Sequence, residues 1–253
     1  MSNAKADMNV PYLSKGMIGL RAGLLLQAYS EEKQKPVTPP IPVDSIMENF
    51  LKLQLSFMDM REVFGVDDVA GALWMDTAEV GVDHTLDPEA HPRMEGRYNF
   101  TVAHEIGHWW LHRRYKLRKP DPMLPFAQGV QADQTAPTYI CRSSIQNRAE
   151  IQANLFASSL LMPKAMVVAI WRDCYGDGPM NIEALRQYGH AALGDDPWMQ
   201  NGRFPRDEDE YNAFLIKAVI RPVAARFRVS LQAMQIRLGE LDLLPKAFPL
   251  AID

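Results

Sequence analysis

The chain has 253 residues, of which 47% are hydrophobic and 23% are charged, the composition of an ordinary soluble globular protein. A formal net charge of −4 argues against a protein whose main role is to coat nucleic acid. Two cysteines without a CxxC pair exclude a disulfide framework and a cysteine-based zinc site, and they fit a reducing compartment. The most apolar N-terminal stretch, residues 17–28, is too short to span a bilayer, so we expect a cytoplasmic protein without a membrane segment.

The N-terminal part is expected to be helical and then extended. Apolar residues recur at helical spacing over residues 16–33, which predicts an amphipathic helix. Prolines crowd residues 36–42, and because proline cannot continue a helix, this stretch is predicted to be a stiff linker. A short helix is predicted over residues 46–52. We therefore assign residues 1–40 to an N-terminal helix and a proline-rich linker.

The middle of the chain predicts a mixed α+β core. Alternating apolar and polar residues predict three short strands, near residues 53–57, 72–75 and 79–82. A helix is expected from Asn99 or Thr101 to about residue 115, and a second helix over residues 148–161. Between them, residues 120–146 show little periodicity, and a connection of this length is often functional. We therefore expect residues 41–164 to form a core with a small three-stranded sheet.

The C-terminal part, residues 165–253, is expected to be helical. Helices are predicted over residues 165–175, over residues 182–193 and within a cluster spanning residues 211–244. Residues 216–238 resemble a helix-turn-helix, and this segment carries four arginines that could contact phosphates: Arg221, Arg226, Arg228 and Arg237. The alternative is a packed helical hairpin with solvated arginines, which the acidic connector at residues 207–210 favours.

The segment His104-Glu105-Ile106-Gly107-His108 carries the predicted chemistry. Residues four apart lie one turn apart on the same face of a helix, so His104 and His108 can bind one metal ion. Glu105 is offset around the helix, where it can reach a water molecule on that metal without being a ligand. This is the arrangement of zinc peptidases, in which the glutamate acts as general base.

A catalytic zinc site needs a third protein ligand. The metzincin pattern is excluded because Leu111 and Arg114 occupy the positions where that class has glycine and histidine. His112 continues the four-residue spacing, but three ligands from one straight helix cannot surround a metal tetrahedrally. We therefore expect His112 to pack near the site or to orient a ligand.

Glu150 is the leading candidate for this third ligand. It shares a face of the predicted helix 148–161 with Ala153 and Ala157, whose small side chains allow a close approach between helices. Asn154 lies one turn beyond Glu150 and could orient a ligand. From spacing alone, Glu150 is as readily an exposed helix glutamate. Two residues of the long connection remain rivals, Asp121 and Asp133.

Two motifs together resemble the ImmA/IrrE family of bacterial metallopeptidases. One covers residues 98–108 with Leu111 and His112, and the other covers residues 150–157 followed by residues 160–163. Weaker likeness extends to residues 40–44, 71–75 and 227–238. The resemblance implies a zincin-like fold, zinc ligands at His104, His108 and Glu150, and a general base at Glu105. It also implies cleavage of a repressor-type DNA-binding protein. The long gap from His108 to Glu150 departs from the family pattern.

The predicted function is therefore a zinc-dependent metallopeptidase that cleaves a protein substrate, such as a helix-turn-helix repressor. One alternative is a DNA-binding regulator that acts through its C-terminal helices, and another is an interaction protein with a structural zinc ion. A His-His-Glu site could also hold manganese. An oxyanion-stabilising residue is expected as well, and three residues qualify by type alone: Arg97, Tyr98 and Tyr139.

Overall fold

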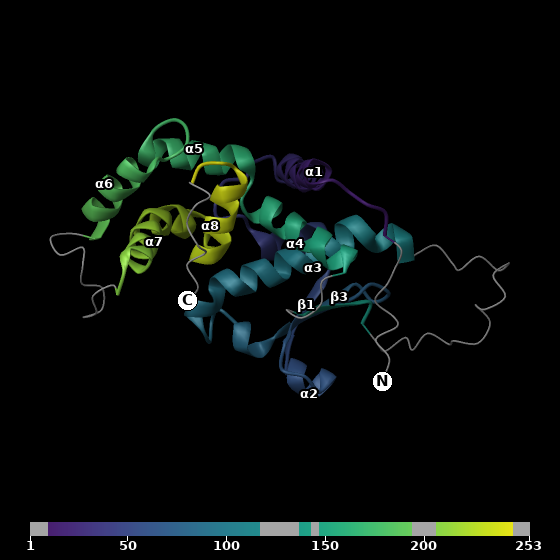
Figure 1. Cartoon of the computed structure of the whole chain (residues 1–253). Coiled ribbons are helices and arrows are strands. Elements are labelled where there is room, and N and C mark those ends of the chain that lie inside the picture. The colour runs from purple at the N-terminus through teal and green to yellow at the C-terminus, as the bar shows by residue number, and fades with distance from the viewer. Residues whose placement is uncertain (1–9, 117–136, 143–146, 194–205, 245–253) are drawn as a thin grey trace. The chain divides into compact units, whose positions relative to one another are not determined.

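The computed structural model describes residues 10–116, 137–142, 147–193 and 206–244. By internal contacts the chain divides into two compact units, and Figure 1 labels most of their helices and two of the strands, β1 and β3. The first unit comprises residues 1–37 and 42–161, and the second comprises residues 38–41 and 162–253. The helix near the N-terminus thus belongs to the first unit. The domain boundaries expected after residues 40 and 164 stay a prediction.

Helix α1, Lys15–Lys33, opens the first unit close to its predicted limits. The side chain of Ser14 caps the helix by accepting a hydrogen bond from the backbone N–H of Met17, and Gln34 ends it in a left-handed conformation. Its buried residues follow the helical repeat and form one apolar face: Ile18, Ala22, Leu25, Leu26 and Tyr29. Helix α1 packs against α4, Arg148–Leu161. A short π-helix at Ser45–Phe50 replaces the α-helix expected over residues 46–52.

The sheet has four strands where three were expected. The strands are β1 (Gln54–Met58), β2 (Val69–Trp74), β3 (Glu79–Asp83) and β4 (Tyr139–Arg142), in the order β1-β3-β2-β4. Strand β1 runs parallel to β3, whereas β2 is antiparallel to both β3 and β4. Strand β4 lies inside the segment predicted to be a loop, and it forms one edge of the sheet. The short helix α2, Met60–Phe64, was also not predicted.

Helix α3, Glu95–Lys116, contacts strands β2, β3 and β4 and packs closely against α4. It begins at Glu95 rather than at Asn99 or Thr101, because a 3-10 turn at Pro92–Met94 leads directly into it. Helix α4 has the predicted limits. The first unit is therefore a zincin-like arrangement in which the two helices that carry the sequence motifs lie side by side (Figure 1).

The second unit consists of helices, as expected. They are α5 (Lys164–Tyr175), α6 (Ile182–Leu193), α7 (Glu208–Phe227) and α8 (Leu231–Glu240). Helices α5, α6 and α8 all contact α7. The chain turns between α7 and α8 at Arg228, which is left-handed, and Ser230 caps α8. The helix-turn-helix interpretation of this pair stays a prediction.

Among the described residues, no helix taken singly has the length and apolarity needed to cross a membrane. Helices α4 and α5 pass this test of length and composition only when they are counted together.

Candidate metal centre

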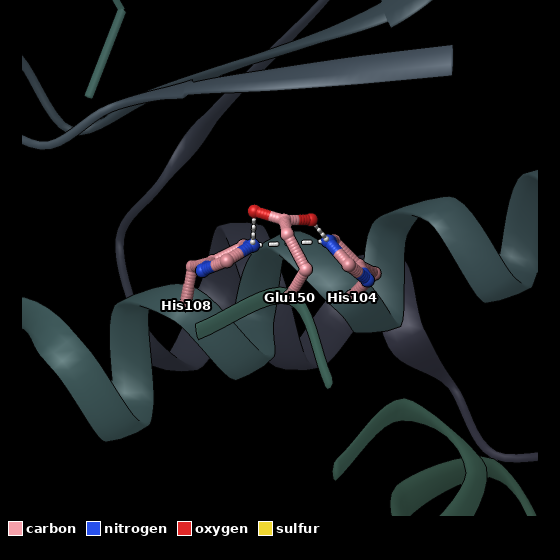
Figure 2. A group of neighbouring side chains, drawn as sticks. All are labelled: His104, His108 and Glu150. Carbon is pink, nitrogen blue, oxygen red and sulfur yellow. Dashed lines mark hydrogen bonds and ion pairs between the residues drawn. The ribbon is translucent and has the colours of Figure 1, made fainter. Parts of the chain in front are cut away.

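Two histidines on α3 direct their imidazole Nε2 atoms towards a common point (Figure 2). His104 and His108 lie one helical turn apart, and their Nε2 atoms are 2.9 Å from each other. Both side chains are buried, with exposed fractions of 1% and 0%. Two imidazole nitrogens this close can supply two of the four positions of a tetrahedral metal site.

Glu150 completes the group from helix α4 (Figure 2). Its Oε2 atom is 3.1 Å from Nε2 of His104, and its Oε1 atom is 3.2 Å from Nε2 of His108. The residue occupies the first turn of α4, where its backbone N–H donates to the Asn147 side chain at 3.0 Å. Glu150 is thus buried and faces both histidines, and it is not the exposed helix glutamate that spacing alone left open.

Small residues let α4 approach α3 closely enough for this contact. A Cβ atom added at Gly107 would lie 3.2 Å from the Cα and carbonyl oxygen of Ala153. Ala153 and Ala157 are both fully buried, as expected for the face that α4 presents to its neighbour. The glycine inside the motif is therefore a packing requirement, because it brings the backbone of α4 within reach of the histidines.

The charges of this group are strongly coupled. Burial alone would raise the pKa of Glu150, but hydrogen bonds to the two histidines lower it to about 2. Burial lowers the pKa of His108 to about 3. The pKa of His104 is raised despite its burial, because Cys141 and Glu150 lie beside it. Without a metal, the group therefore consists of a carboxylate, a protonated His104 and a neutral His108.

Glu105 lies beside this group with no hydrogen-bond partner for either carboxylate oxygen among the described residues. Its exposed fraction is 0%, and burial raises its pKa to about 8. Strand β2 leaves space for it at Gly71, where an added Cβ atom would lie 3.1 Å from Oε1 of Glu105. A buried carboxylate without a partner is costly, so it indicates a ligand or a water molecule that would satisfy it.

Each histidine also has a partner on its second ring nitrogen. Nδ1 of His104 is 2.9 Å from Oδ1 of Asn154, the residue expected to orient a ligand. Nδ1 of His108 is 3.1 Å from Nδ1 of His112. His112 therefore lies directly behind His108, in keeping with its expected place near the site. Gln152, which contacts His112, lies in the second motif but was given no role by the sequence analysis.

Of the three residues suggested as oxyanion stabilisers, only Tyr139 contacts the group. Its ring stacks on His108 with centroids 3.9 Å apart, and its buried hydroxyl has no partner among the described residues. Tyr98 instead donates to Asp44 at 2.7 Å, and Arg97 borders a hollow beside Asp59 and Asp83. The rival ligands Asp121 and Asp133 lie outside the described residues.

The donor set suits a catalytic zinc ion. Two imidazole nitrogens and one carboxylate supply three ligands, and the unpartnered Glu105 carboxylate is available to a fourth, non-protein ligand. His104, Glu105 and Cys141 also lie close enough to hold a metal. That second group shares His104 with the first, and it would use the Glu105 carboxylate as a ligand.

In sequence, residues 90–177 match peptidase family M78, whose shared domain is described as the IrrE N-terminal-like domain. The matched range contains α3 and α4 and therefore every residue of the candidate centre. No curated protein matches the chain. The family match confirms the resemblance to ImmA/IrrE metallopeptidases that the two motifs predicted, and it supports a metal-dependent peptidase.

Proposed function

We propose that the chain is a zinc-dependent endopeptidase, since residues 90–177 match a metallopeptidase family. In this proposal His104, His108 and Glu150 hold the ion and Glu105 is the general base. The observation that carries the proposal is the burial of three metal-binding side chains around one point, next to a carboxylate that has no protein partner.

The residues around the ion divide the chemistry between them. Zinc, when bound, would polarise the scissile carbonyl and lower the pKa of a water molecule to about 7. Glu105 would take the proton of this water and pass it to the leaving amine. Burial raises the pKa of Glu105 to about 8 in the metal-free chain, and the charge of a bound zinc ion would lower it, so that the carboxylate would be able to accept a proton near neutral pH.

Strand β4 is where we propose that the substrate binds. It forms an edge of the sheet, and among the described residues it pairs with β2 alone. An extended peptide can add to such an edge through main-chain hydrogen bonds. Tyr139 on this strand stacks on His108, and burial raises the pKa of its hydroxyl, so the group stays a donor at neutral pH. We assign it the stabilisation of the oxyanion.

We further propose that the substrate is a repressor-type DNA-binding protein cleaved at one site, as the resemblance to the ImmA/IrrE family implies. The DNA-binding alternative receives no support from the described part of the chain. Arg237, one of its four arginines, donates to the carbonyl of Met162 at 3.0 Å and contacts Glu240 at 3.2 Å. Its guanidinium is therefore occupied within the second unit.

The first experiment measures metal content by elemental mass spectrometry on protein purified without added metal. We expect about one zinc per chain in the wild type from the three-ligand set, and a large loss in His104→Ala and Glu150→Ala. Glu105→Gln should retain the metal, because this residue is not a ligand. Glu89→Gln, which changes an exposed loop glutamate in the same unit, is the matched control.

Cleavage is then read as new N-termini in a proteome-derived peptide library and in candidate repressor proteins. Wild type and Glu89→Gln should generate new termini, Glu105→Gln none, and Tyr139→Phe fewer by about 100-fold if its hydroxyl stabilises the oxyanion. Zinc retained by Glu150→Ala would refute the third ligand. A wild type that binds zinc but cleaves nothing would favour a structural role for the metal.

A further inference from the structure

Behind His108, a line of buried side chains runs from the candidate metal centre to the main chain of residue 11. Nδ1 of His108 is 3.1 Å from Nδ1 of His112, and Nε2 of His112 is 3.0 Å from Oε1 of Gln152. The amide nitrogen of Gln152 donates to the carbonyl of Pro11 at 2.8 Å. Three elements thus meet in one line of hydrogen bonds: α3, α4 and the segment that precedes α1.

The carbonyl of Pro11 fixes the direction of every hydrogen bond in this line. A carbonyl can only accept, so Gln152 must turn its NH₂ group towards Pro11 and its oxygen towards His112. His112 must then carry its proton on Nε2 and accept on Nδ1. His108 in turn must carry its proton on Nδ1, which leaves the lone pair of Nε2 available to a metal ion held between it and the carboxylate of Glu150.

This is the tautomer that a metal-binding histidine needs. The opposite direction would set the oxygen of Gln152 against the carbonyl of Pro11 and would place a proton on Nε2 of His108. In the direction set by Pro11, both ring nitrogens of His112 and both amide atoms of Gln152 have a suitable partner, and these two side chains are buried. The direction of the hydrogen bonds and the chemistry of the site therefore agree.

The fixed end of the line is held by a second contact. Arg148, at the start of α4, donates to the carbonyl of Val10 at 3.1 Å, and the Val10 side chain is buried. Two successive carbonyls of the N-terminal segment are thus bound to α4. The second ring nitrogen of His104 contacts Asn154, which is exposed, whereas that of His108 contacts the buried His112. His108 therefore has the longer line of buried partners behind it.

We propose that His112 and Gln152 are positioning residues that hold His108 in its metal-binding tautomer, with the main chain at residues 10–11 as the fixed reference. The proposal rests on the proposed function, because it assumes that His108 binds a metal. It gives the N-terminal segment a role in the metal centre. Partners of this kind typically raise metal affinity by about 10–100-fold.

The direct test is the tautomer of His112 in the zinc-loaded full chain, read from long-range proton–nitrogen NMR correlations of the imidazole rings. We expect a neutral His112 with its proton on Nε2, and a His108 with its proton on Nδ1. Gln152→Met keeps the length of the side chain but removes both hydrogen bonds. It should produce a mixture of His112 tautomers and weaken zinc binding by about 10-fold or more, measured by competition with a chelator.

Two further substitutions separate orientation from packing. His112→Asn keeps an amide oxygen near the position of Nδ1 and should retain more zinc affinity than His112→Leu, which offers no acceptor. Ile151→Met changes the neighbouring exposed residue of α4 and should leave both zinc affinity and the His112 signal unchanged. A merely structural role for His112 predicts instead that the leucine and asparagine variants lose affinity equally.

The outcomes distinguish the two proposals. Absence of zinc binding by the wild type would overturn the proposed function itself. Zinc bound at one equivalent with the His112 proton on Nδ1, or a folded Gln152→Met that binds zinc as tightly as the wild type, would overturn only the positioning role. If Gln152→Met does not fold, the wild-type tautomer decides alone.

Discussion

At the scale of single residues, Glu105 departs most from what folding favours. Its carboxylate is fully buried without a hydrogen bond from any described residue, and burial raises its pKa to about 8. Such a group lowers stability unless something satisfies it. A buried, unpartnered carboxylate beside three candidate metal ligands is what the proposed role of general base requires.

Glu105→Gln should change how the stability of the metal-free protein depends on pH. The pKa of this carboxyl is raised from 4.5 to about 8, so the folded state keeps a proton that the unfolded state releases. Its contribution to stability is fully present below pH 4.5 and is lost as the pH rises to about 8. Glutamine does not titrate and removes this slope, which is about 1.4 kcal/mol per pH unit.

The measurement is the free energy of unfolding in urea for metal-free wild type and Glu105→Gln between pH 5 and 8. We expect the free energy of unfolding of Glu105→Gln to increase relative to that of the wild type as the pH rises, because the other titrating groups are common to both proteins. Glu89→Gln, at an exposed position, should follow the wild type at every pH. Parallel curves for wild type and Glu105→Gln would show that Glu105 has a partner in solution.

The candidate residues that the sequence singles out most directly are those whose relation is local. His104, Glu105 and His108 follow from spacing on one helix, because a turn of helix fixes their geometry. Glu150 needed the resemblance, since its approach to α3 depends on packing between two helices. Gln152 was missed because its partner Pro11 is 141 positions away in the chain. No periodicity predicts a contact between a side chain and a distant carbonyl.

At the scale of elements, the close contact between α3 and α4 brings the candidate ligands together. Gly107→Ala should therefore disturb both folding and metal binding. Its new Cβ atom would lie 3.2 Å from the backbone of Ala153, which cannot move without moving α4 and Glu150. We expect a loss of about 1–3 kcal/mol in the free energy of unfolding and a weaker affinity for zinc.

Gly23→Ala is the matched control for this substitution. Gly23 also lies inside a helix, but it is exposed and an added Cβ atom would meet nothing within 4 Å. Alanine is the better helix former, so this variant should gain up to about 1 kcal/mol of stability and bind zinc like the wild type. If the two alanine variants behave alike in urea unfolding and zinc titration, the close contact between Gly107 and Ala153 does not hold the ligands in place.

The observed elements also show which secondary structure the sequence patterns predict and which they miss. Helices α4 and α6 have the limits predicted from apolar spacing, since amphipathic helices of this length carry a clear repeat. Strand β4 has four residues, too few for an alternation to be recognised. It is defined by its pairing with β2, where Leu73 lies opposite Tyr139. The edge strand beside the candidate site was therefore not predictable.

At the scale of the whole molecule, the chain has two units, and all three candidate ligands lie in the first. Each unit contains fully buried apolar side chains of its own. Those of the first include Leu25, Leu73, Ile106 and Phe156, and those of the second include Leu215, Val223, Phe227 and Leu238. Zinc is therefore expected to stabilise one unit selectively.

Hydrogen–deuterium exchange followed by mass spectrometry tests this expectation. A ligand that binds only the folded state adds about 2.7 kcal/mol of stability at 100 times its dissociation constant. Zinc should slow exchange in α3, α4 and the strands that contact α3, because opening these elements releases the metal. Exchange in α7 and α8 should not change. His104→Ala should show no zinc-dependent slowing anywhere, which excludes a non-specific effect of the metal. Equal slowing in α3 and α7 would instead mean that the two units open together, and the metal centre would then control the stability of the entire chain.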